Sequence, residues 1–448
     1  MKKNKSNILL IKPEPAHNSF SLEMALSTEP LELEYIAAML KKEQYPFYIW
    51  EASIEEPESF DHILQQLQPD YVLITGYITQ EYLMLQYAQK AKAYNSEIIT
   101  VIGGSHAQLN PSHFQKECID FICRSDNIFG ILSILKKEPL SSVDGLCYVK
   151  DGRWQENELK PFSINLLPLP DRTLSNKRMQ HYRYLDVSPL ALLKTSTSCP
   201  YQCSFCYGRS LNCSAYTVRE LDKVIEEIKT IASPNIWIVD DDFLFDKNRL
   251  LEFIKRLKKE RIEKTFICYG RADFISKERD ILIKLKEVGF RYIMVGLETA
   301  NNSLLEAYQK KTSLDINIQC IKVLKKLDIN IVGLFIVDIH FTSRDFRNMR
   351  RFIRQSGISY TGVSIFTPIP GTSMFEQYKD QLLTQDMEKW DFMHLVLPPV
   401  HMSRFRFYLE YYRLVMLLFA IAEKKGIYRF LTLSDYKKIF WGLIWKDS

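Results

Sequence analysis

The stretch Thr197-Ser198-Cys199-Pro200-Tyr201-Gln202-Cys203-Ser204-Phe205-Cys206-Tyr207-Gly208 places three cysteines in a CxxxCxxC spacing within one short loop. Thiolates are soft ligands that suit iron–sulfur clusters, and three neighbouring thiolates can bind three irons of a four-iron cube. The fourth iron of such a cube keeps an open position, where a small molecule can bind and be reduced. The spacing therefore predicts a 4Fe-4S cluster with Cys199, Cys203 and Cys206 as its ligands.

The remaining cysteines favour neither a zinc site nor a disulfide framework. A zinc site needs four ligands, and Cys213 lies seven residues after Cys206, but zinc ligands usually come as two separated pairs and the sequence has no second pair. Disulfides are typical of small secreted chains, whereas this chain is long, rich in lysine and starts without a cleavable apolar segment. We expect the other five cysteines to be small buried hydrophobic residues: Cys118, Cys123, Cys147, Cys268 and Cys320.

Length and composition predict a large cytoplasmic enzyme. A chain of 448 residues should form two or three domains, and its 46% hydrophobic and 25% charged residues are ordinary for globular proteins. The formal net charge of +5 gives no reason to expect a nucleic-acid partner. The longest uncharged apolar run, residues 414–422, is too short for a transmembrane segment.

The first 138 residues alternate between short apolar strands and amphipathic helices. Apolar strands without polar alternation predict a parallel, doubly wound Rossmann-like sheet, which binds ligands beyond the carboxyl ends of its strands. At two of those ends the sequence reads Gly76-Tyr77 and Gly103-Gly104-Ser105-His106-Ala107. Glycines there let the backbone approach a bulky ligand, although they also serve as simple turn formers. The predicted strands are 8–11, 47–50, 71–74, 98–102 and 119–123, and the predicted helical segments are 31–41, 60–67, 81–94 and 111–116.

A linker follows at residues 139–190, containing a hairpin at 145–148 and 154–156 and the phrase Leu167-Pro168-Leu169-Pro170-Asp171-Arg172. Residues 191–370 then repeat a strand–helix unit six times, with the cysteine loop directly after the first strand. This pattern predicts an incomplete (β/α)6 barrel with its site at the carboxyl ends of the strands, although periodicity alone also allows a second doubly wound sheet.

Polar residues follow several strands of this predicted barrel. Asp240-Asp241-Asp242 follows the second strand, and three adjacent carboxylates repel one another unless a cation is near. Arg271 follows the third strand and Glu298 the fourth. The alternatives are helix-capping aspartates, and a structural ion pair of Glu298 with Arg271 or Lys311. His340, after the fifth strand, is either a proton donor or a satisfied structural histidine.

Residues 371–448 are predicted to be helical and carry aromatic residues at helical spacing. Such a stripe is typical of core packing, here as a lid on the barrel, while an apolar substrate pocket or a membrane contact is the alternative. Exposed arginines on the same helix would support the second interpretation. The stripe is formed by Phe405, Phe407, Tyr408, Tyr411, Tyr412, Phe419 and Phe430, and the arginines are Arg404, Arg406 and Arg413.

Taken together, these segments resemble the cobalamin-binding branch of the radical S-adenosylmethionine (SAM) superfamily. The resemblance rests on the CxxxCxxC loop with Phe205 before its last cysteine, residues 103–107, the linker phrase 167–172 and Gly296-Leu297-Glu298-Thr299. It implies that the open iron chelates SAM and cleaves it reductively to a 5′-deoxyadenosyl radical. It also implies SAM contacts from Phe205, Asp242, Arg271 and Glu298, and cobalamin contacts from Gly76, Tyr77, Gly103, Gly104 and His106.

Three segments of the chain differ from the patterns of other cobalamin proteins or of closer relatives. After the first strand it has Lys12-Pro13-Glu14-Pro15-Ala16-His17, without the DxHxxG loop by which other cobalamin proteins supply an axial histidine, an absence usual in the radical SAM branch. Leu31 follows Pro30 in the first helix, where relatives more often have a glycine, and residues 124–127 replace a Gly-Glu-Gly stretch. A domain that retains the fold without cobalamin is the alternative interpretation.

The resemblance implies methylation of an unactivated carbon through methylcobalamin. The alternatives are radical cyclisation, rearrangement or oxidation without methyl transfer, or a non-catalytic metal-binding protein. The expected partners are a small-molecule or lipid-like substrate and a reductant such as flavodoxin or ferredoxin.

Overall fold

Five parallel strands form the centre of the first sheet in the computed structural model, which describes residues 5–19, 24–56 and 59–437. Their spatial order is β3-β1-β4-β5-β6, as expected for a doubly wound fold. The apolar runs are buried on both faces, because helices cover both sides of the sheet. The strands are β1 (Ile8–Lys12), β3 (Phe47–Glu51), β4 (Tyr71–Thr75), β5 (Ile99–Gly103) and β6 (Phe121–Cys123).

Helices on the two faces bury separate apolar clusters. On one face α3 (Phe60–Leu67) and α4 (Glu81–Tyr94) pack around Trp50, whose ring contacts Phe60 and Tyr87. On the other face α1 (Leu31–Lys42) and α6 (Phe129–Leu135) cover the sheet. The predicted Rossmann-like domain is therefore confirmed. Two shorter helices belong to the same region: α2 (Ala52–Glu55) and α5 (Ser105–Leu109).

The hairpin assigned to the linker extends the first sheet. Strands β7 (Leu146–Lys150) and β8 (Arg153–Glu156) pair antiparallel, and β7 also pairs antiparallel with β6. An uncovered β6 would leave a row of unpaired backbone groups at the sheet edge, and the hairpin satisfies them. The sheet consequently has seven strands and is mixed rather than purely parallel.

Six parallel strands form the second sheet, in an order that follows the sequence. The described strands do not close into a ring, so the predicted incomplete barrel is confirmed. In sequence order the strands are β10 (Leu190–Leu193), β13 (Asn235–Ile238), β14 (Thr265–Tyr269), β15 (Phe290–Glu298), β16 (Asn330–Val337) and β17 (Tyr360–Ile365). The connecting helices are α8 (Leu221–Thr230), α9 (Lys247–Lys259), α10 (Ala272–Lys277), α11 (Arg279–Glu287), α12 (Asn302–Ala307), α13 (Leu314–Lys326) and α14 (Ser343–Ser356).

The inner face of the second sheet packs against the first domain. One apolar cluster contains Leu31 and Tyr35 of α1, Phe162 of the linker, and Trp237 and Met294 of the sheet. The two domains thus share a buried apolar interface. The linker adds α7 (Thr173–Arg178) and two short ladders: β2 (Leu26–Ser27) with β9 (Arg183–Tyr184), and β11 (Ser196–Thr197) with β12 (Thr217–Val218).

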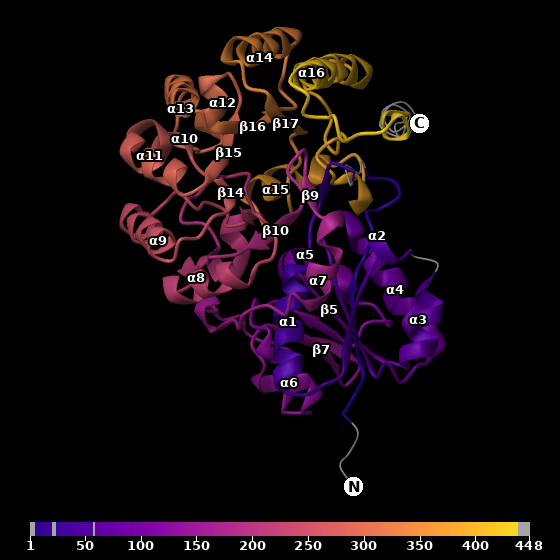
Figure 1. Ribbon diagram of the computed structural model, residues 1–448. Coiled ribbons are helices and arrows are strands. Elements are labelled where there is room, and N and C mark those ends of the chain that lie inside the picture. Colours follow the sequence, from indigo (N-terminus) through magenta and orange to yellow (C-terminus); the bar gives the residue numbers. More distant parts are fainter. Residues whose placement is uncertain (1–4, 20–23, 57–58, 438–448) are drawn as a thin grey trace.

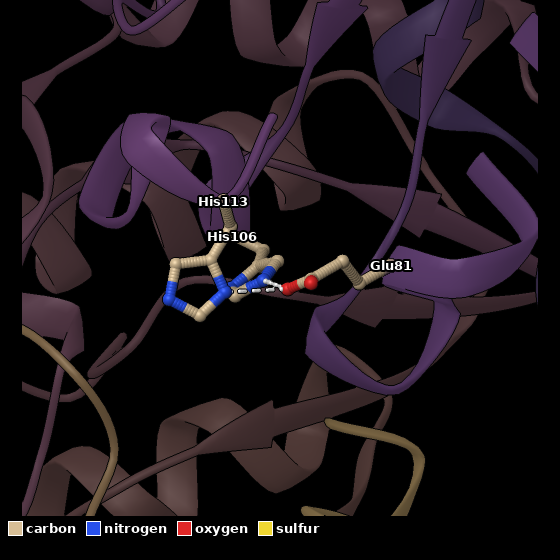
Figure 2. Close-up of side chains that lie close together, drawn as sticks. All are labelled: Glu81, His106 and His113. Carbon is tan, nitrogen blue, oxygen red and sulfur yellow. Dashed lines mark hydrogen bonds and ion pairs between the residues drawn. The ribbon is translucent and has the colours of Figure 1, made fainter. Parts of the chain in front are cut away.

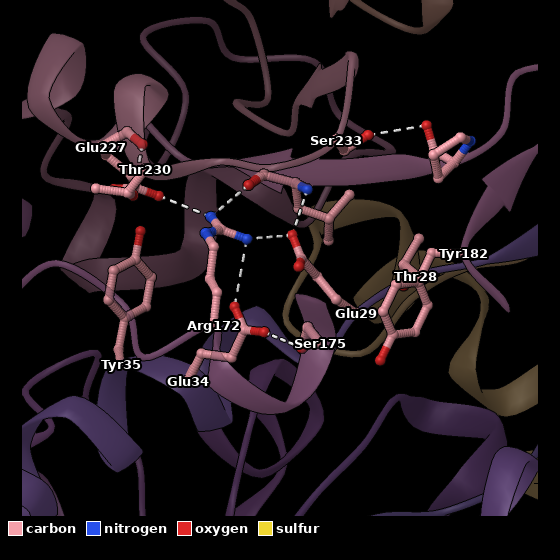
Figure 3. A network of polar contacts seen from close by, with 12 residues as sticks. Thr28, Glu29, Glu34, Tyr35, Arg172, Ser175, Tyr182, Glu227, Thr230 and Ser233 are labelled. Atoms are coloured by element: carbon pink, nitrogen blue, oxygen red, sulfur yellow. Dashed lines mark hydrogen bonds and ion pairs between the residues drawn. The ribbon is translucent and has the colours of Figure 1, made fainter. Parts of the chain in front are cut away.

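A buried ion network centred on Arg172 crosses the same interface (Figure 3). The guanidinium of Arg172 is bonded to Glu29, to Glu34 of α1 and, at 2.8 Å, to Glu227 of α8, and it donates to the carbonyl of Leu192 at 2.7 Å. Burial and the neighbouring charge of Glu29 raise the pKa of Glu34 well above its usual range. The last residue of the linker phrase therefore connects both domains.

The C-terminal region is helical at both described ends and irregular between them. Helix α15 (Ser373–Tyr378) and helix α16 (Arg404–Lys424) flank a segment with only short turns at 379–381 and 387–389, where continuous helix was expected. Helix α16 lies against α14 and β17 (Figure 1). Within the described residues, no helix is long and apolar enough to cross a membrane.

The aromatic stripe divides between core and surface. Phe407 and Tyr411 are buried against the second domain, which confirms core packing for them. Phe405 is 80% exposed, so its assignment to the buried face is wrong. The arginines Arg406 and Arg413 pair with Glu410 on the same helix, at 2.9 and 3.7 Å. Residues 438–448 of the predicted helical region lie outside the described part.

Candidate functional site

The cysteine loop begins where β10 ends, and Asp240 fixes its start. The Asp240 carboxylate accepts hydrogen bonds from the backbone N–H groups of Thr195 and Ser196, at 2.6 and 3.0 Å, and from the Thr195 hydroxyl. The first aspartate of the triplet therefore holds the turn rather than capping a helix, and the next helix, α9, is capped by Asp246. This turn presents Cys199, Cys203 and Cys206 as partly buried free thiols.

The thiols of Cys199 and Cys206 lie in an environment that favours their neutral form. Burial raises the pKa of Cys199 to about 12 and that of Cys206 to about 11. Iron binds the thiolate, so cluster assembly must release these protons. The donor set of three soft sulfur ligands in one loop fits a 4Fe-4S cluster with one open iron.

Arg271 places a positive charge beside the cysteine loop. Its Nη1 lies 3.7 Å from the Cys203 sulfur, and its guanidinium stacks on the Tyr201 ring with 3.9 Å to the ring centroid. Asp273 holds the guanidinium from the other side at 3.0 Å. This position suits stabilisation of anionic sulfur or of a carboxylate bound at the open iron.

Asp242 is a buried carboxylate without a partner. It is 3% exposed, and among the described residues neither of its oxygens has a hydrogen-bond partner. Burial raises its pKa to about 7, against the opposing effect of Arg271. A buried acceptor left unpaired is costly, so this orphaned carboxylate fits a ligand that brings a cation, as the ammonium of SAM would.

Glu298 ends β15 in a left-handed conformation, with φ of 56°. Its carboxylate forms a buried ion pair with Lys310. The structural pairing considered from sequence, with Arg271 or Lys311, is therefore wrong in its partner. Arg271 instead donates to the backbone carbonyl of Lys310, which links the two basic residues.

Phe205 supports the cysteine loop from below. Its ring packs edge-on against Tyr308 at 5.2 Å, and the Ser204 N–H donates to the Tyr308 carbonyl at 3.2 Å. The Tyr308 hydroxyl donates to Asp338, which also pairs with His340 Nδ1 at 2.7 Å. His340 therefore has a structural partner, as one of the two interpretations from sequence required.

A cavity of about 280 Å³ lies between the first domain and the second sheet. It is lined by the carboxyl ends of β4 and β5, by α1 and by Lys194 at the end of β10. Gly103 and Gly104 line it, and a Cβ on Gly103 would have no other atom within 4 Å. The backbone at Gly103 is therefore open to the cavity, which suits close approach by a ligand such as part of cobalamin.

The predicted cobalamin residues do not all face this cavity. Tyr77 lines it, and Gly104 has a φ of 101° that allows the close turn after β5. A Cβ on Gly76 would lie 2.8 Å from the Met84 sulfur, so this glycine instead permits packing of α4. His106 is buried and bonded to Glu81 at 2.6 Å (Figure 2). It is not among the residues that line this first cavity.

A second cavity, of about 290 Å³, lies beside the first. Tyr77 lines both cavities, and Tyr207, which directly follows the last cluster cysteine, lines the second. The other walls come from α5 and from the C-terminal segment, with Trp390 and Phe392. The second cavity therefore lies between the glycine loops of the first domain and the cysteine loop.

Two contributors to the site were missed from sequence. Lys194 faces the first cavity; burial would lower its pKa, but the charges of Asp126 and Glu32 keep it above the usual range. Asp126 also accepts a hydrogen bond from the Thr197 hydroxyl at 2.8 Å, which ties the first domain to the cysteine loop. Asp126 lies in segment 124–127, where the sequence differs from the family, and Lys194 lies just before the cysteine loop. These positions were the only sequence signals that could have pointed to the two residues.

Comparisons with known proteins agree with this arrangement. Residues 193–353 match the model of the Radical SAM superfamily, and residues 21–127 match the B12 binding domain. An uncharacterized methyltransferase of Pyrococcus horikoshii is 25% identical over 411 residues, which covers 88% of each chain. The hopanoid C-3 methylase of Methylococcus capsulatus is 25% identical over 387 residues, 83% of this chain and 73% of the methylase.

A relative that is named a cyclase and not a methyltransferase also matches. The anaerobic magnesium-protoporphyrin IX monomethyl ester cyclase of Cereibacter sphaeroides is 23% identical over 415 residues, 87% of this chain and 67% of the cyclase. Among solved structures, the cobalamin-dependent SAM radical enzyme OxsB, with aqua-cobalamin and SAM bound, superposes with a TM-score of 0.76. That match covers 97% of this chain and 70% of OxsB at 15% identity, so it supports the fold.

The two domain matches, the free cysteine triad, the orphaned Asp242 and the open space at Gly103 point to one set of cofactors: a 4Fe-4S cluster, SAM and cobalamin. The chain therefore carries a B12 binding domain followed by a radical SAM domain, which is the domain pair of cobalamin-binding radical SAM enzymes.

Proposed function

We propose that this enzyme methylates an unactivated carbon of a small, largely apolar substrate. The observation that carries the proposal is the second cavity, which Tyr77 of the cobalamin side and Tyr207 of the cluster side both line. A substrate there would lie between the two cofactors. When bound, the cluster supplies the electron that cleaves SAM, and cobalamin carries the methyl group.

In this scheme the side chains of the enzyme bind and orient SAM and keep water out of the substrate cavity. The Asp242 carboxylate would accept hydrogen bonds from the SAM ammonium group. Arg271 lies beside Cys203, where its positive charge would pair with the SAM carboxylate at the open iron. Glu298 and Lys310 form a preorganised ion pair at the end of β15 for polar groups of SAM. Trp390, which is fully buried, helps exclude water from the second cavity.

The lining of the second cavity indicates the substrate class. Among the described residues it contains no lysine or arginine, and its Asp391 is already paired with His394 at 2.8 Å. Aromatic and aliphatic side chains form most of the wall. An uncharged, largely apolar molecule, including one of lipid character, fits this surface better than a phosphate or an acid.

A labelled methyl group tests the reaction. Cluster-loaded, cobalamin-loaded enzyme is supplied with reductant, candidate apolar substrates and SAM labelled in its methyl group. Label in the product, together with S-adenosylhomocysteine and 5′-deoxyadenosine in equal amounts, is the expected result. A product without label, formed with 5′-deoxyadenosine alone, would instead indicate cyclisation, rearrangement or oxidation.

The reductant and the compartment follow from the chemistry. All nine cysteines are free thiols, as is typical of a reducing compartment, and SAM cleavage needs a low-potential electron. We therefore place the enzyme in the cytoplasm with flavodoxin or ferredoxin as its electron donor. Replacing the chemical reductant by either protein should sustain turnover.

A further inference from the structure

Three potential metal ligands converge outside the cofactor sites. Glu81 begins α4, His106 lies on α5, and His113 lies in the following turn, residues 111–114. Figure 2 shows the two imidazoles pointing at one carboxylate, and the distances from Glu81 Oε2 are 2.6 Å to His106 Nε2 and 2.8 Å to His113 Nδ1. Three separate segments of the first domain thus bring their side chains to one point.

The donor atoms form a set that suits a transition metal. One atom from each of the three residues lies within 4.8 Å of the other two. Two imidazole nitrogens and one carboxylate oxygen are ligands that zinc and other divalent first-row metals prefer. The second oxygen of Glu81, Oε1, has no hydrogen bond to any described residue, so it too is available as a donor.

A neighbouring amide can orient His106 for such a role. The side chain of Asn110 lies 3.3 Å from His106 Nδ1, the nitrogen that faces away from Glu81. Metal-bound histidines usually donate their other ring N–H to an acceptor, and the amide oxygen of Asn110 can serve after rotation of the amide group. His106 itself is 3% exposed and is held firmly in place.

The group of three side chains, Glu81, His106 and His113, borders the second cavity. His106, Ser105 and Asn110 belong to the lining of that cavity, opposite Trp390 and Phe392. The His113 side chain is 30% exposed, which leaves a route for an ion from solvent. Three protein ligands leave a fourth tetrahedral position, as in metal sites that bind a further small ligand.

We propose that Glu81, His106 and His113 bind one divalent transition-metal ion, with zinc as the best-suited ion, at the edge of the second cavity. The site is separate from the 4Fe-4S cluster and does not depend on methyl transfer. In the metal-free protein the two imidazoles share the Glu81 carboxylate through hydrogen bonds. The competing role is a purely structural hydrogen-bond cluster that holds the loop after β5.

Metal analysis of the cluster-loaded, full-length enzyme separates these roles, because the cluster already occupies the three cysteines. After dialysis against micromolar zinc and removal of free ion, we expect about one zinc per chain. His113→Ala should lose most of this zinc and still fold, since His113 is partly exposed. His62→Ala, at an exposed histidine on α3, is the matched control and should keep the zinc.

X-ray absorption at the zinc edge identifies the ligands. Nitrogen and oxygen scatterers at about 2.0–2.1 Å would support the site, whereas a sulfur shell near 2.3 Å would indicate zinc on a cysteine and overturn it. The proposal also fails if the wild-type enzyme retains no zinc, or if His113→Ala retains as much as His62→Ala. Activity is not needed for any of these measurements.

Discussion

At the scale of single residues, the proposed contact of Asp242 with SAM predicts how SAM binding depends on pH. Its pKa is raised to about 7, and only the carboxylate attracts an ammonium group. SAM should therefore bind about tenfold more tightly at pH 8 than at pH 6 in the cluster-loaded enzyme. Asp242→Asn should weaken binding at pH 8 and remove most of the pH dependence, as measured by anaerobic equilibrium dialysis.

A matched substitution controls for this test. Asp328 is another aspartate, with a side chain that is 96% exposed, and Asp328→Asn should leave both affinities unchanged. Equal pH dependence in the wild-type enzyme and in Asp242→Asn would remove Asp242 from the SAM site.

The same carboxyl group has a consequence for stability without SAM. The pKa of Asp242 is higher in the folded than in the unfolded chain, so protonation of this carboxyl group stabilises the folded state at low pH. This contribution to the free energy of unfolding is complete below about pH 4 and is lost as the pH rises through about 7. Asp242→Asn should therefore stabilise the SAM-free protein at pH 8, by an amount on the order of 4 kcal/mol, and have little effect at pH 4. Calorimetric melting at the two pH values measures the difference, and a variant less stable at pH 8 would contradict it.

A side chain introduced at Gly103 tests whether the first cavity binds cobalamin. Because a Cβ there meets no atom within 4 Å, Gly103→Leu should fold normally and fill the space that the cofactor needs. We expect loss of the cobalamin absorption bands after reconstitution with hydroxocobalamin, at an unchanged melting temperature. Gly104→Ala should instead destabilise the protein, since its φ is 101° and its Cβ would lie 2.8 Å from the Thr75 hydroxyl. Full cobalamin binding by Gly103→Leu would place the cofactor elsewhere.

At the scale of elements, α16 separates two aromatic residues that the sequence treats alike. Phe407 is fully buried, whereas Phe405 is 80% exposed. Phe407→Ala should cost about 3–5 kcal/mol of stability, and Phe405→Ala less than about 0.5 kcal/mol. Thermal unfolding of the two variants compares them directly. Similar losses would mean that Phe405 is covered in solution.

Buried strands were the elements most accessible from sequence. Runs such as Ile8–Ile11 and Ile331–Val337 are apolar without alternation, and covering helices on both faces make that pattern unambiguous. Helix α10 was not predicted, because its six residues are too few to show helical periodicity. The pairing of the hairpin with β6 was also missed, since a sheet edge becomes visible only in the assembled fold.

The site was predictable where a motif fixes the chemistry and less so where a contact crosses domains. The spacing of the three cysteines is enough to predict them as cluster ligands, and the charge of Asp242 at a strand end is enough to make it a candidate SAM contact. His106 points toward Glu81 and not into the first cavity, because Glu81 at the start of α4 bonds to its ring. Helix α4 is distant from the glycine loop in sequence, so this contact could not be predicted. The contact of Asp126 with Thr197 depends on docking of one domain on the other.

At the scale of the whole molecule, the Arg172 network contains more carboxyl groups than cations. Arg172 and Arg219 face Glu29, Glu34 and Glu227, and burial with the neighbouring charge of Glu29 raises the pKa of Glu34 well above its usual range, which favours its protonated form. Arg172→Met should therefore cost about 3–5 kcal/mol by leaving buried carboxylates unpaired. Glu34→Gln should cost less than Arg172→Met, because the raised pKa of Glu34 favours the neutral form that glutamine imitates. Calorimetry of both variants tests this, and equal losses would show that Glu34 is charged.

The same network limits how such enzymes can be recombined. Glu34 comes from the first domain, Arg172 from the linker and Glu227 from the second domain, so a junction anywhere between them divides the set. A chimera that joins the amino-terminal half of one relative to the carboxyl-terminal half of another would inherit unmatched charges in a buried place. Grafting a new substrate-binding half onto this chain should therefore succeed only when all the partners of Arg172 are transferred with it.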